Sequence, residues 1–246
     1  MTDVSELKLS VAISLFNYGR YIAAAMASVC SQSIAGAIEL IVVDDASTDD
    51  SLLQVESFQR EHAPLMARLG AFRCERHHHN RGLAEARNTA FAIASTPAVL
   101  VLDADNTLLS KAAAFLLTAL QNAPADVGAV YPLLAVQGHP EQVLANELPW
   151  DPERFRSGNY VDALALVRRD AWRQVGGFQH TPGGWEDFDF WCRFVENGLR
   201  AQQVPNLLAI YRHHGDSMKN SETARRQREL QHLLEARHPW LELTTG

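Results

Sequence analysis

Short apolar runs that alternate with helix-like segments limit the fold of this 246-residue chain more than any other feature. The runs Leu9–Leu15, Ile38–Val43 and Ala98–Leu102 are brief, rich in β-branched residues and almost continuously apolar. Runs of this kind are typical of strands that helices cover on both faces of a parallel sheet. Segments such as Tyr21–Ser31 and Ser51–Arg60 have a helix-like composition. We therefore predict an α/β fold with a mostly parallel, Rossmann-like sheet flanked by helices.

The second half of the chain continues this alternation less regularly. Between Gln137 and Asn159 the sequence is rich in Gly, Pro and polar residues, so we expect surface loops there. Thr223–Arg237 has the pattern of a charged helix with a leucine stripe, which could pack on the body, on a second subunit or on a membrane surface. The remaining predictions are strands at Gly70–Cys74, Val127–Val136, Val161–Arg168 and Leu207–Tyr211, and helices at Leu83–Ser95, Ser110–Gln121, Asp170–Val175 and Phe188–Asn197.

Composition and charge argue against several classes of protein. Hydrophobic residues make up 47% and charged residues 21% of the chain, which is typical of a globular protein. The formal net charge of −7 argues against nucleic acid as a partner. The three cysteines are odd in number and far apart, so neither a disulfide framework nor a zinc site is indicated.

The sequence also lacks the patterns of membrane insertion. Neither a signal peptide nor a run of 18 apolar residues is present, so we expect a protein without a transmembrane segment. Together with the cysteine usage this favours a cytoplasmic location, with peripheral contact at the inner face of the membrane left open.

Two carboxylates lie one residue apart at the end of a predicted strand, in VLVLDADNTL, residues 99–108. Asp103 and Asp105 can both reach forward from the strand end toward one cation. Mg²⁺ and Mn²⁺ prefer such oxygen ligands and keep water or phosphate oxygens in the rest of their shell. The alternative is that Asp105 and its neighbours only build a turn and cap the next helix. Phosphatases of the haloacid-dehalogenase class and nucleotide-sugar transferases both use such a pair, so the pair alone leaves both open.

Polar and aromatic residues follow several of the predicted strands. Phe16 comes after the first strand, Asp45 after the second, and Asp103 with Asp105 after a later one. Ligands of open α/β sheets bind beyond the carboxyl ends of the strands, so we expect these side chains to meet in one crevice. A carboxylate such as Asp45 could accept the imide N–H of uracil, or could instead serve the turn into the next helix. We interpret the run His77–Asn80 as surface or satisfied polar residues.

Arg87 is expected on the inward side of a predicted helix. At ~100° per residue it falls about 40° from Leu83, near the apolar stripe rather than opposite to it. An inward arginine needs an anionic partner, which the strand-end carboxylates or a phosphate could supply. The alternative is that the stem packs on the surface while the charged head stays in water.

Glu186 and Asp187 follow Gly-Gly-Trp185 at the start of an aromatic-rich segment. Acids at a helix start cap the helix and complement its dipole. We also expect a carboxylate there to stay ionised, so that it could accept a proton from a hydroxyl. His214, which follows the last predicted strand, is a candidate third metal ligand.

Taken in order, these segments resemble the family 2 glycosyltransferases, which have the A-type glycosyltransferase fold. The resemblance runs from about Leu9 to about Ser217 and depends on the order and spacing of the motifs. In this chain the motifs are Phe16-Asn17, Ser28-Val-Cys-Ser-Gln32, Ile41 to Asp49, Asn80 to Asn88, Asp103-Ala-Asp105, Gly176-Gly-Phe178, Glu186-Asp187 and Tyr211-Arg-His-His-Gly-Asp-Ser217. The chain departs from the family at Ser14-Leu15, where Pro and a small polar residue are common, and at Asn106, where a third Asp is frequent.

The resemblance implies a role for each candidate residue. On the donor side, Phe16 and Asp45 would hold the base, Arg87 would support that pocket, and Asp103 would contact the ribose. The ligands of a bound Mn²⁺ or Mg²⁺ would be Asp105 and His214. On the acceptor side, Asp187 would be the catalytic base, with Trp185 and Glu186 near the acceptor.

The resemblance also implies an activity and a division of the chain. The activity is that of an inverting, metal-dependent glycosyltransferase that moves a sugar from a nucleotide-diphosphate donor, most often a UDP-sugar, to a glycan or another hydroxyl acceptor, as in cell-surface glycan synthesis. We expect one glycosyltransferase domain over residues 1–220, with a nucleotide-binding half at about 8–110 and an acceptor-side half at about 111–220, followed by a helical tail at 221–246.

Two other functions stay open at this point. One is a phosphatase that uses Asp103 and Asp105, and the other is a catalytically silent protein of the same fold that only binds a partner. The phosphatase is less favoured because the chain has only three lysines, Lys8, Lys111 and Lys219, and its later acid Asp216 does not follow an apolar strand.

Overall fold

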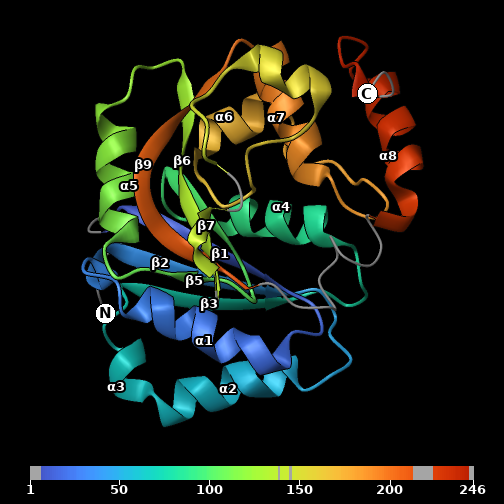
Figure 1. Ribbon diagram of the computed structural model, residues 1–246. Coiled ribbons are helices and arrows are strands. Elements are labelled where there is room, and N and C mark those ends of the chain that lie inside the picture. The colour runs from blue at the N-terminus through green and yellow to red at the C-terminus, as the bar shows by residue number, and fades with distance from the viewer. Residues whose placement is uncertain (1–6, 138, 144–145, 213–223, 244–246) are drawn as a thin grey trace.

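The computed structural model describes residues 7–137, 139–143, 146–212 and 224–243. These residues form one nine-stranded sheet in the order β3-β2-β1-β4-β8-β6-β9-β5, with β7 paired to β6. The first four strands of this order run parallel: β1 (Leu9–Leu15), β2 (Ile38–Asp44), β3 (Ala71–Arg76) and β4 (Ala98–Asp103). The predicted α/β fold with a mostly parallel sheet is confirmed (Figure 1).

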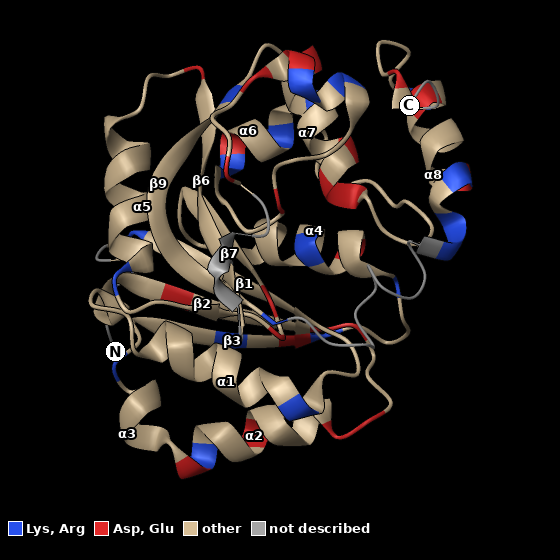
Figure 2. Ribbon diagram, viewed as in Figure 1, with Lys and Arg blue, Asp and Glu red and all other residues tan. Residues whose placement is uncertain are grey.

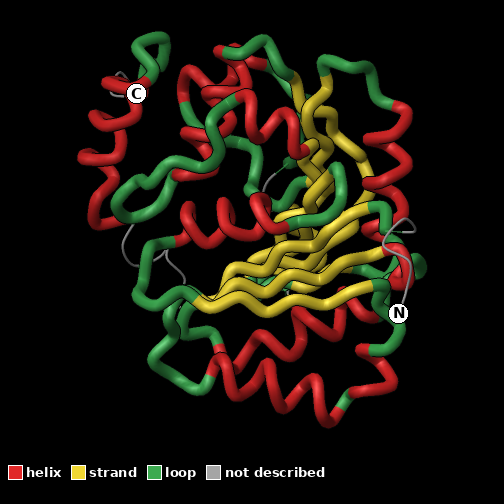
Figure 3. The backbone as a smooth tube through the Cα atoms, turned by 180° about the vertical axis from the view of Figure 1, so that it is seen from behind, coloured by secondary structure: helices red, strands yellow, loops and turns green. Residues whose placement is uncertain are grey.

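Helices cover both faces of these parallel strands. α1 (Gly19–Cys30), α2 (Ser51–Glu61) and the short α3 (Ala63–Met66) lie on one face, and α4 (Leu83–Ile93) lies on the other (Figures 1 and 3). This arrangement explains why the sequences of β1, β2 and β4 are almost continuously apolar, since neither face of the sheet meets water at these strands, whereas the edge strand β3 is mostly exposed and carries polar residues.

Two apolar cores therefore form, one on each side of the sheet. Leu40 and Val42 of β2 belong to the core that includes α1, whereas Ile41 and Val43 belong to the core that includes α4. All four side chains are fully buried. Successive residues of a strand point to opposite faces, so a single short run contributes to both cores.

The second half of the chain extends the sheet and adds helices around it. Its strands are β5 (Thr107–Leu108), β6 (Val127–Val136), β7 (His139–Val143), β8 (Leu166–Arg168) and β9 (Arg200–Tyr211). Its helices are α5 (Ala112–Asn122), α6 (Arg169–Gln174), α7 (Glu186–Glu196) and α8 (Ala224–Arg237), and short 3₁₀ turns occur at Ala35–Ala37 and Pro152–Ser157. α8 lies at the outer side of α7 (Figure 1).

Three predictions for this half are wrong in part. The strand predicted at Leu207–Tyr211 begins already at Arg200. The Gln137–Asn159 segment contains β7 and a 3₁₀ turn and is not loop throughout. The predicted strand Val161–Arg168 is reduced to β8, because side chains take backbone groups that a sheet ladder would use. Asn146 Oδ1 accepts from the Asp162 N–H at 2.8 Å, and Asp162 Oδ1 accepts from the Leu164 N–H at 2.8 Å.

Several helices begin elsewhere than predicted. α1 begins at Gly19, two residues before the predicted start, and α6 begins at Arg169, one residue before it. α5 begins at Ala112, and Ser110 instead uses its carbonyl to accept from the Ser33 N–H. α7 begins at Glu186, two residues before the predicted start, because Trp185 takes a left-handed conformation with a φ of 65° and turns the chain into the helix. Of the helices in the described part of the chain, none combines the length and hydropathy needed to cross a bilayer.

The strand order places a crevice at the carboxyl end of the parallel sheet. From β1 the chain passes outward to β2 and β3, and it then returns to β4 on the other side of β1. The chain leaves β1 towards β2 on one side of the sheet, and it leaves β4 towards β5 on the other side. These two connections diverge, which leaves an opening beyond the ends of β1 and β4. Phe16 follows β1 and Ala104 follows β4 at this opening.

Candidate active site

A pocket of about 1060 Å³ lies at this opening. It brings together residues from the ends of β1, β2 and β4, from α4, and from the segments that precede β8 and α7. Eight of the nine candidate residues line it: Phe16, Asp45, Arg87, Asp103, Asp105, Trp185, Glu186 and Asp187. The ninth, His214, lies outside the described residues.

Asp45 is buried directly after β2, and its carboxylate is held at the start of α4. Oδ1 accepts from the Arg81 N–H at 2.8 Å and Oδ2 accepts from the Gly82 N–H at 2.7 Å. His77 Nδ1 lies 2.6 Å from Oδ1. A carboxylate offers about four acceptor positions, and these contacts use three of them. Asp45 therefore keeps capacity for one more donor while its orientation is fixed.

His77 is a residue of the site that the sequence interpretation did not assign a role. It is buried, and its second nitrogen, Nε2, lies 2.9 Å from Thr89 Oγ1 of α4. The neighbouring His78 and His79 are exposed, so only one member of the triple contributes to the site. His77 follows β3, and its contact with Asp45 depends on β3 lying beside β2, which the sequence alone does not show.

Arg87 points inward from α4, as predicted. Only 2% of its side chain is exposed. Nη1 donates to Glu186 Oε1 at 2.6 Å and Nη2 donates to Asp103 Oδ1 at 3.0 Å. Burial alone would lower the pKa of the guanidinium, but the two carboxylates raise it above its ordinary value, so the charge is retained. Arg87 thus joins the strand-end acid Asp103 to the start of α7.

Asp103 and Asp105 face the pocket from the end of β4. The alternative that this segment caps the next helix is wrong, because α5 begins only at Ala112. Asn106 instead accepts from the Arg212 N–H through Oδ1 at 3.1 Å, and Arg212 Nε donates to the Asp105 carbonyl at 3.2 Å. These contacts fix the acidic turn against the end of β9.

Tyr18 adds a further polar group beside this acidic pair. It lines the pocket, and burial together with Asp105 and Asp103 raises the pKa of its phenol above the ordinary value. The sequence interpretation did not single out Tyr18.

Trp185, Glu186 and Asp187 enter the pocket from the start of α7. The preceding Gly183 and Gly184 both have positive φ, at 97° and 113°, which lets the chain turn sharply before the helix. Asp187 Oδ2 accepts from Asn159 Nδ2 at 3.0 Å, and Oδ1 accepts from the Phe188 N–H at 2.8 Å.

The expectation that the helix start keeps Asp187 ionised is wrong for the isolated protein. Burial, followed by the nearby carboxylates of Glu186 and Asp162, raises the pKa of Asp187 to about 8. Arg87 partly offsets this effect. A carboxyl group with a pKa near neutral pH is suited to taking a proton in a reaction.

The donor chemistry at the end of β4 fits a hard divalent cation. Asp103 and Asp105 offer carboxylate oxygens, and Asp105 is buried at the pocket wall. Oxygen ligands of this type suit Mg²⁺ or Mn²⁺. Among the described residues no group of three or more His, Cys, Asp or Glu forms a complete metal cage.

Comparison with known proteins gives a family match and several relatives. Residues 10–175 match the sequence model described as Glycosyl transferase family 2. The succinoglycan biosynthesis protein ExoU of Rhizobium meliloti (strain 1021) is 40% identical over 106 residues, which cover 43% of this chain and 28% of that protein. The chain spans less than a third of the length of the first curated relatives that it matches.

Solved structures share the fold at low sequence identity. S. aureus TarS (residues 1–349) in complex with UDP-GlcNAc has a TM-score of 0.72 and 19% identity, covering 94% of this chain and 66% of that one. The mannosyltransferase PcManGT from Pyrobaculum calidifontis, in complex with GDP-Man and Mn²⁺, has a TM-score of 0.67 and 23% identity, covering 96% and 66%. These likenesses extend over nearly the whole chain and show that it shares the fold.

Proposed function

The chain belongs to glycosyl transferase family 2, and from this membership we propose that it transfers a sugar from a nucleotide-diphosphate donor to the hydroxyl group of an acceptor. The observation that carries the proposal is the pocket in which Asp45, Asp103, Asp105 and Asp187 meet although they are distant in sequence. A donor diphosphate with its cation needs oxygen ligands, and an attacking hydroxyl needs a base, so this set of groups suits both.

On the donor side, Phe16 and Asp45 hold the base and Asp103 contacts the ribose. The remaining acceptor position of Asp45 Oδ2 supports this role, because the imide N–H of uracil could donate to it. UDP is our preferred nucleotide, and the UDP-GlcNAc and UDP complexes of TarS support that choice. Arg87 supports the pocket by keeping Asp103 in place. The nucleotide-binding half then corresponds to about residues 8–110 and the acceptor-side half to about 111–220.

A divalent cation, Mn²⁺ or Mg²⁺, neutralises charge on the departing diphosphate when it is bound. Asp105 would hold it together with His214, and the Mn²⁺ in the PcManGT complex supports this proposal. Tyr18 lies close enough to Asp103 and Asp105 for the two carboxylates to raise the pKa of its phenol.

The proposed reaction is a single displacement with inversion. Asp187 takes the proton of the acceptor hydroxyl as that oxygen forms a bond to the anomeric carbon. The bond from the same carbon to the diphosphate oxygen breaks, and the nucleoside diphosphate leaves. Asn159 orients the Asp187 carboxylate through its 3.0 Å hydrogen bond, and Trp185 and Glu186 lie where the acceptor would enter.

The proposal is tested by incubating the protein with UDP-sugars and GDP-mannose in Mn²⁺, Mg²⁺ or EDTA and measuring released nucleoside diphosphate. We expect metal-dependent release from at least one donor, and a loss of about 10²–10⁴-fold in Asp187→Asn. Asp126→Asn, which removes an exposed carboxylate paired with Arg200, is the matched control and should retain activity.

Other outcomes of the same assay favour the alternatives. Hydrolysis of a phosphomonoester without release of nucleoside diphosphate would indicate the phosphatase. Binding of a nucleotide-sugar without turnover in any metal would indicate a silent binding protein. Near-normal activity in Asp187→Asn would remove that residue from the role of base.

A further inference from the structure

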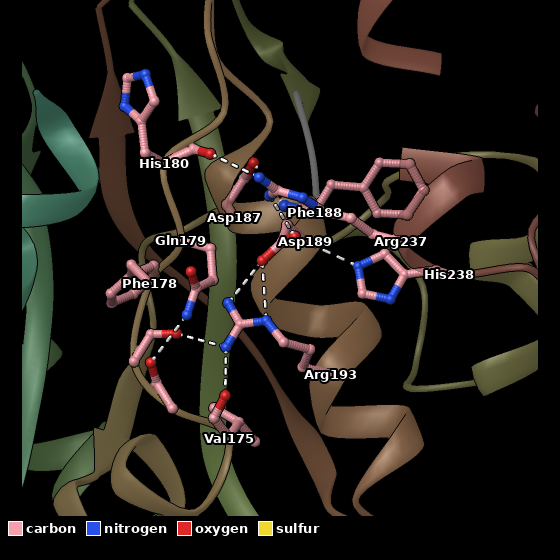
Figure 4. Close-up of polar contacts among 12 residues, drawn as sticks. Val175, Phe178, Gln179, His180, Asp187, Phe188, Asp189, Arg193, Arg237 and His238 are labelled. Atoms are coloured by element: carbon pink, nitrogen blue, oxygen red, sulfur yellow. Dashed lines mark hydrogen bonds and ion pairs between the residues drawn. The ribbon is translucent and has the colours of Figure 1, made fainter. Parts of the chain in front are cut away.

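A cluster of charged residues around the buried Asp189, behind the pocket, connects the C-terminal helix to the pocket wall. It consists of Asp189, Arg193, Arg237 and His238, and we call it the Asp189 cluster (Figure 4). Asp189 lies on α7, two residues after Asp187, and its side chain is 1% exposed. None of the roles proposed above uses these four residues.

Asp189 receives donors on both carboxylate oxygens. Oδ2 accepts from Arg193 Nε at 2.9 Å and Nη2 at 2.6 Å, and Oδ1 accepts from Arg237 Nη1 at 2.9 Å. His238 Nε2 lies 3.4 Å from Oδ1. Burial alone would raise the pKa of Asp189, but hydrogen bonds and charges from His238, Arg193 and Arg237 lower it to about 2. The carboxylate is therefore ionised and fixes both arginines.

Each of these arginines also donates to backbone carbonyls of the segment that leads to the pocket. Arg193 Nη1 donates to the carbonyls of Val175 and Gly177, and Arg237 Nη2 donates to the carbonyl of His180 at 3.0 Å. His180, Thr181 and the residues from Gly183 to Asp187 line the pocket. One buried carboxylate thus holds, through two arginines, three backbone points of the segment that ends in the proposed base.

The end of α8 is packed into the body of the molecule. Leu230 and Leu234 are buried, and Leu234 belongs to the same apolar core as α7. His238 Nδ1 lies 2.7 Å from Glu196 Oε1, and Trp240 Nε1 donates to the same oxygen at 2.8 Å. The helix is thereby held in place, so that Arg237 reaches His180 from a fixed position.

We propose that Arg237, oriented by Asp189, is a positioning residue for the pocket wall at residues 178–185, and that it sets the rate of sugar transfer without binding the donor. The segment between His180 and Trp185 contains two glycines with positive φ and can therefore adopt other conformations easily. A tether at the His180 carbonyl limits this freedom, and it keeps Trp185 and the start of α7 where the acceptor would enter. The proposal rests on the transferase function proposed above.

The test compares Arg237→Met with Arg237→Lys. The methionine keeps an apolar stem and loses every hydrogen bond, whereas the lysine keeps a charge for Asp189 but lacks the planar fork that reaches two acceptors. Because the Arg237 side chain is 34% exposed, both variants are expected to fold. Arg228 is exposed on the same helix, so Arg228→Met and Arg228→Lys are the matched controls.

The expected result separates turnover from stability. In Arg237→Met, kcat should fall on the order of tenfold to a hundredfold while the donor KM stays within about twofold, because a small misplacement of reacting groups reduces rate more than binding. Arg237→Lys should recover the thermal stability of the parent protein but not its kcat. The Arg228 variants should match the parent protein in all three quantities.

Hydrogen–deuterium exchange gives a readout that needs no activity. In Arg237→Met, the amides of residues 178–185 should exchange several-fold faster, while those of β1 should not change. Unchanged exchange and unchanged kcat in Arg237→Met would overturn the proposal, as would full recovery of kcat in Arg237→Lys. If no donor is turned over by any variant, the transferase function fails, whereas the exchange data still report whether the tether exists.

Discussion

At the scale of single residues, Asp187 combines chemical suitability with a cost to stability. Its pKa in the folded protein is raised to about 8, whereas the pKa of an aspartate in an unfolded chain is about 3.9. Between these pH values the folded state keeps a proton that the unfolded state has released. The free energy of unfolding contributed by this group therefore falls as the pH rises from about 4 to about 8. Asp187 must be ionised to act as a base, and its ionisation destabilises the folded protein.

Replacing Asp187 by Asn should consequently stabilise the protein at pH 8 while it reduces turnover. Asparagine stays neutral, so the penalty for ionising the partly buried carboxyl disappears. We expect a gain of at least about 1 kcal/mol at pH 8, equivalent to ~2–4 °C in melting temperature, and a smaller gain at pH 5. Thermal unfolding at both values measures this, and a variant less stable than the parent at pH 8 would contradict the raised pKa.

His77 illustrates what the sequence does not reveal about a single residue. Three consecutive histidines favour an interpretation as surface or satisfied polar residues. His78 and His79 are exposed, and His77 is buried with partners on both ring nitrogens. The burial of His77 and its pairing with Asp45 depend on β3 lying beside β2, which is a tertiary fact. Arg87 could be predicted to face inward because helical spacing alone places it there.

Replacing His77 by Ala should weaken nucleotide binding. Asp45 would lose one of its three donors and the carboxylate would gain rotational freedom, so we expect the Kd for UDP to rise about 10-fold, equivalent to ~1.4 kcal/mol. The exposed neighbour provides the control, since His78→Ala should leave the Kd unchanged. Equal effects of the two substitutions on UDP binding would show that His77 does not support Asp45.

At the scale of elements, α4 joins the two halves of the pocket. Besides Arg87, it presents Asn88, whose Oδ1 accepts from the Phe178 N–H at 2.8 Å and from Trp172 Nε1 at 3.1 Å. Asn88 Nδ2 donates to the Phe178 carbonyl at 2.8 Å. One helix thus fixes both the strand-end acid Asp103 and the segment that leads to Asp187.

Gly177 packs against this junction, and its replacement by Ala should be costly. A Cβ there would lie 2.7 Å from Asn88 Oδ1, an atom held by two hydrogen bonds, at a φ of 74°. Gly198 has a similar φ of 68° but nothing within 4 Å of its Cβ position, so Gly198→Ala reports backbone strain alone. We expect Gly177→Ala to cost about 1–3 kcal/mol more than Gly198→Ala in denaturant unfolding. Equal losses of unfolding free energy in the two variants would mean that the residues around Asn88 move aside without strain.

The buried strands β1, β2 and β4 were predictable, whereas the exposed β3 extends to Arg76, beyond its predicted end at Cys74, and β5 was not predicted. β1 has its predicted bounds, and β2 and β4 end one residue beyond theirs, because buried parallel strands have an unmistakable apolar pattern. The start of α7 depends on the left-handed conformation of Trp185, and the short β8 depends on side chains of Asn146 and Asp162 that compete for backbone groups. Such local competition leaves no periodic signal in a sequence.

At the scale of the whole molecule, acidic groups from remote segments gather at one opening. Figure 2 shows acidic residues at the strand ends and at the start of α7, and basic residues along α8. Sequence order alone predicted the convergence of the strand-end groups, because parallel strands share one carboxyl edge. It did not predict that α8 contacts α7 through the Asp189 cluster, since that contact depends on how the tail packs.

The most direct test of the account is calorimetric titration of the protein with UDP and with GDP, in Mn²⁺ and in EDTA. If Asp105 helps to hold a cation against the donor diphosphate, one of these nucleotides should bind in Mn²⁺ and at least about 10-fold more weakly in EDTA. Asp105→Asn should lose most of this difference, and Asp126→Asn should keep it. Failure of both nucleotides to bind in Mn²⁺, or equal binding in Mn²⁺ and EDTA, would contradict the account.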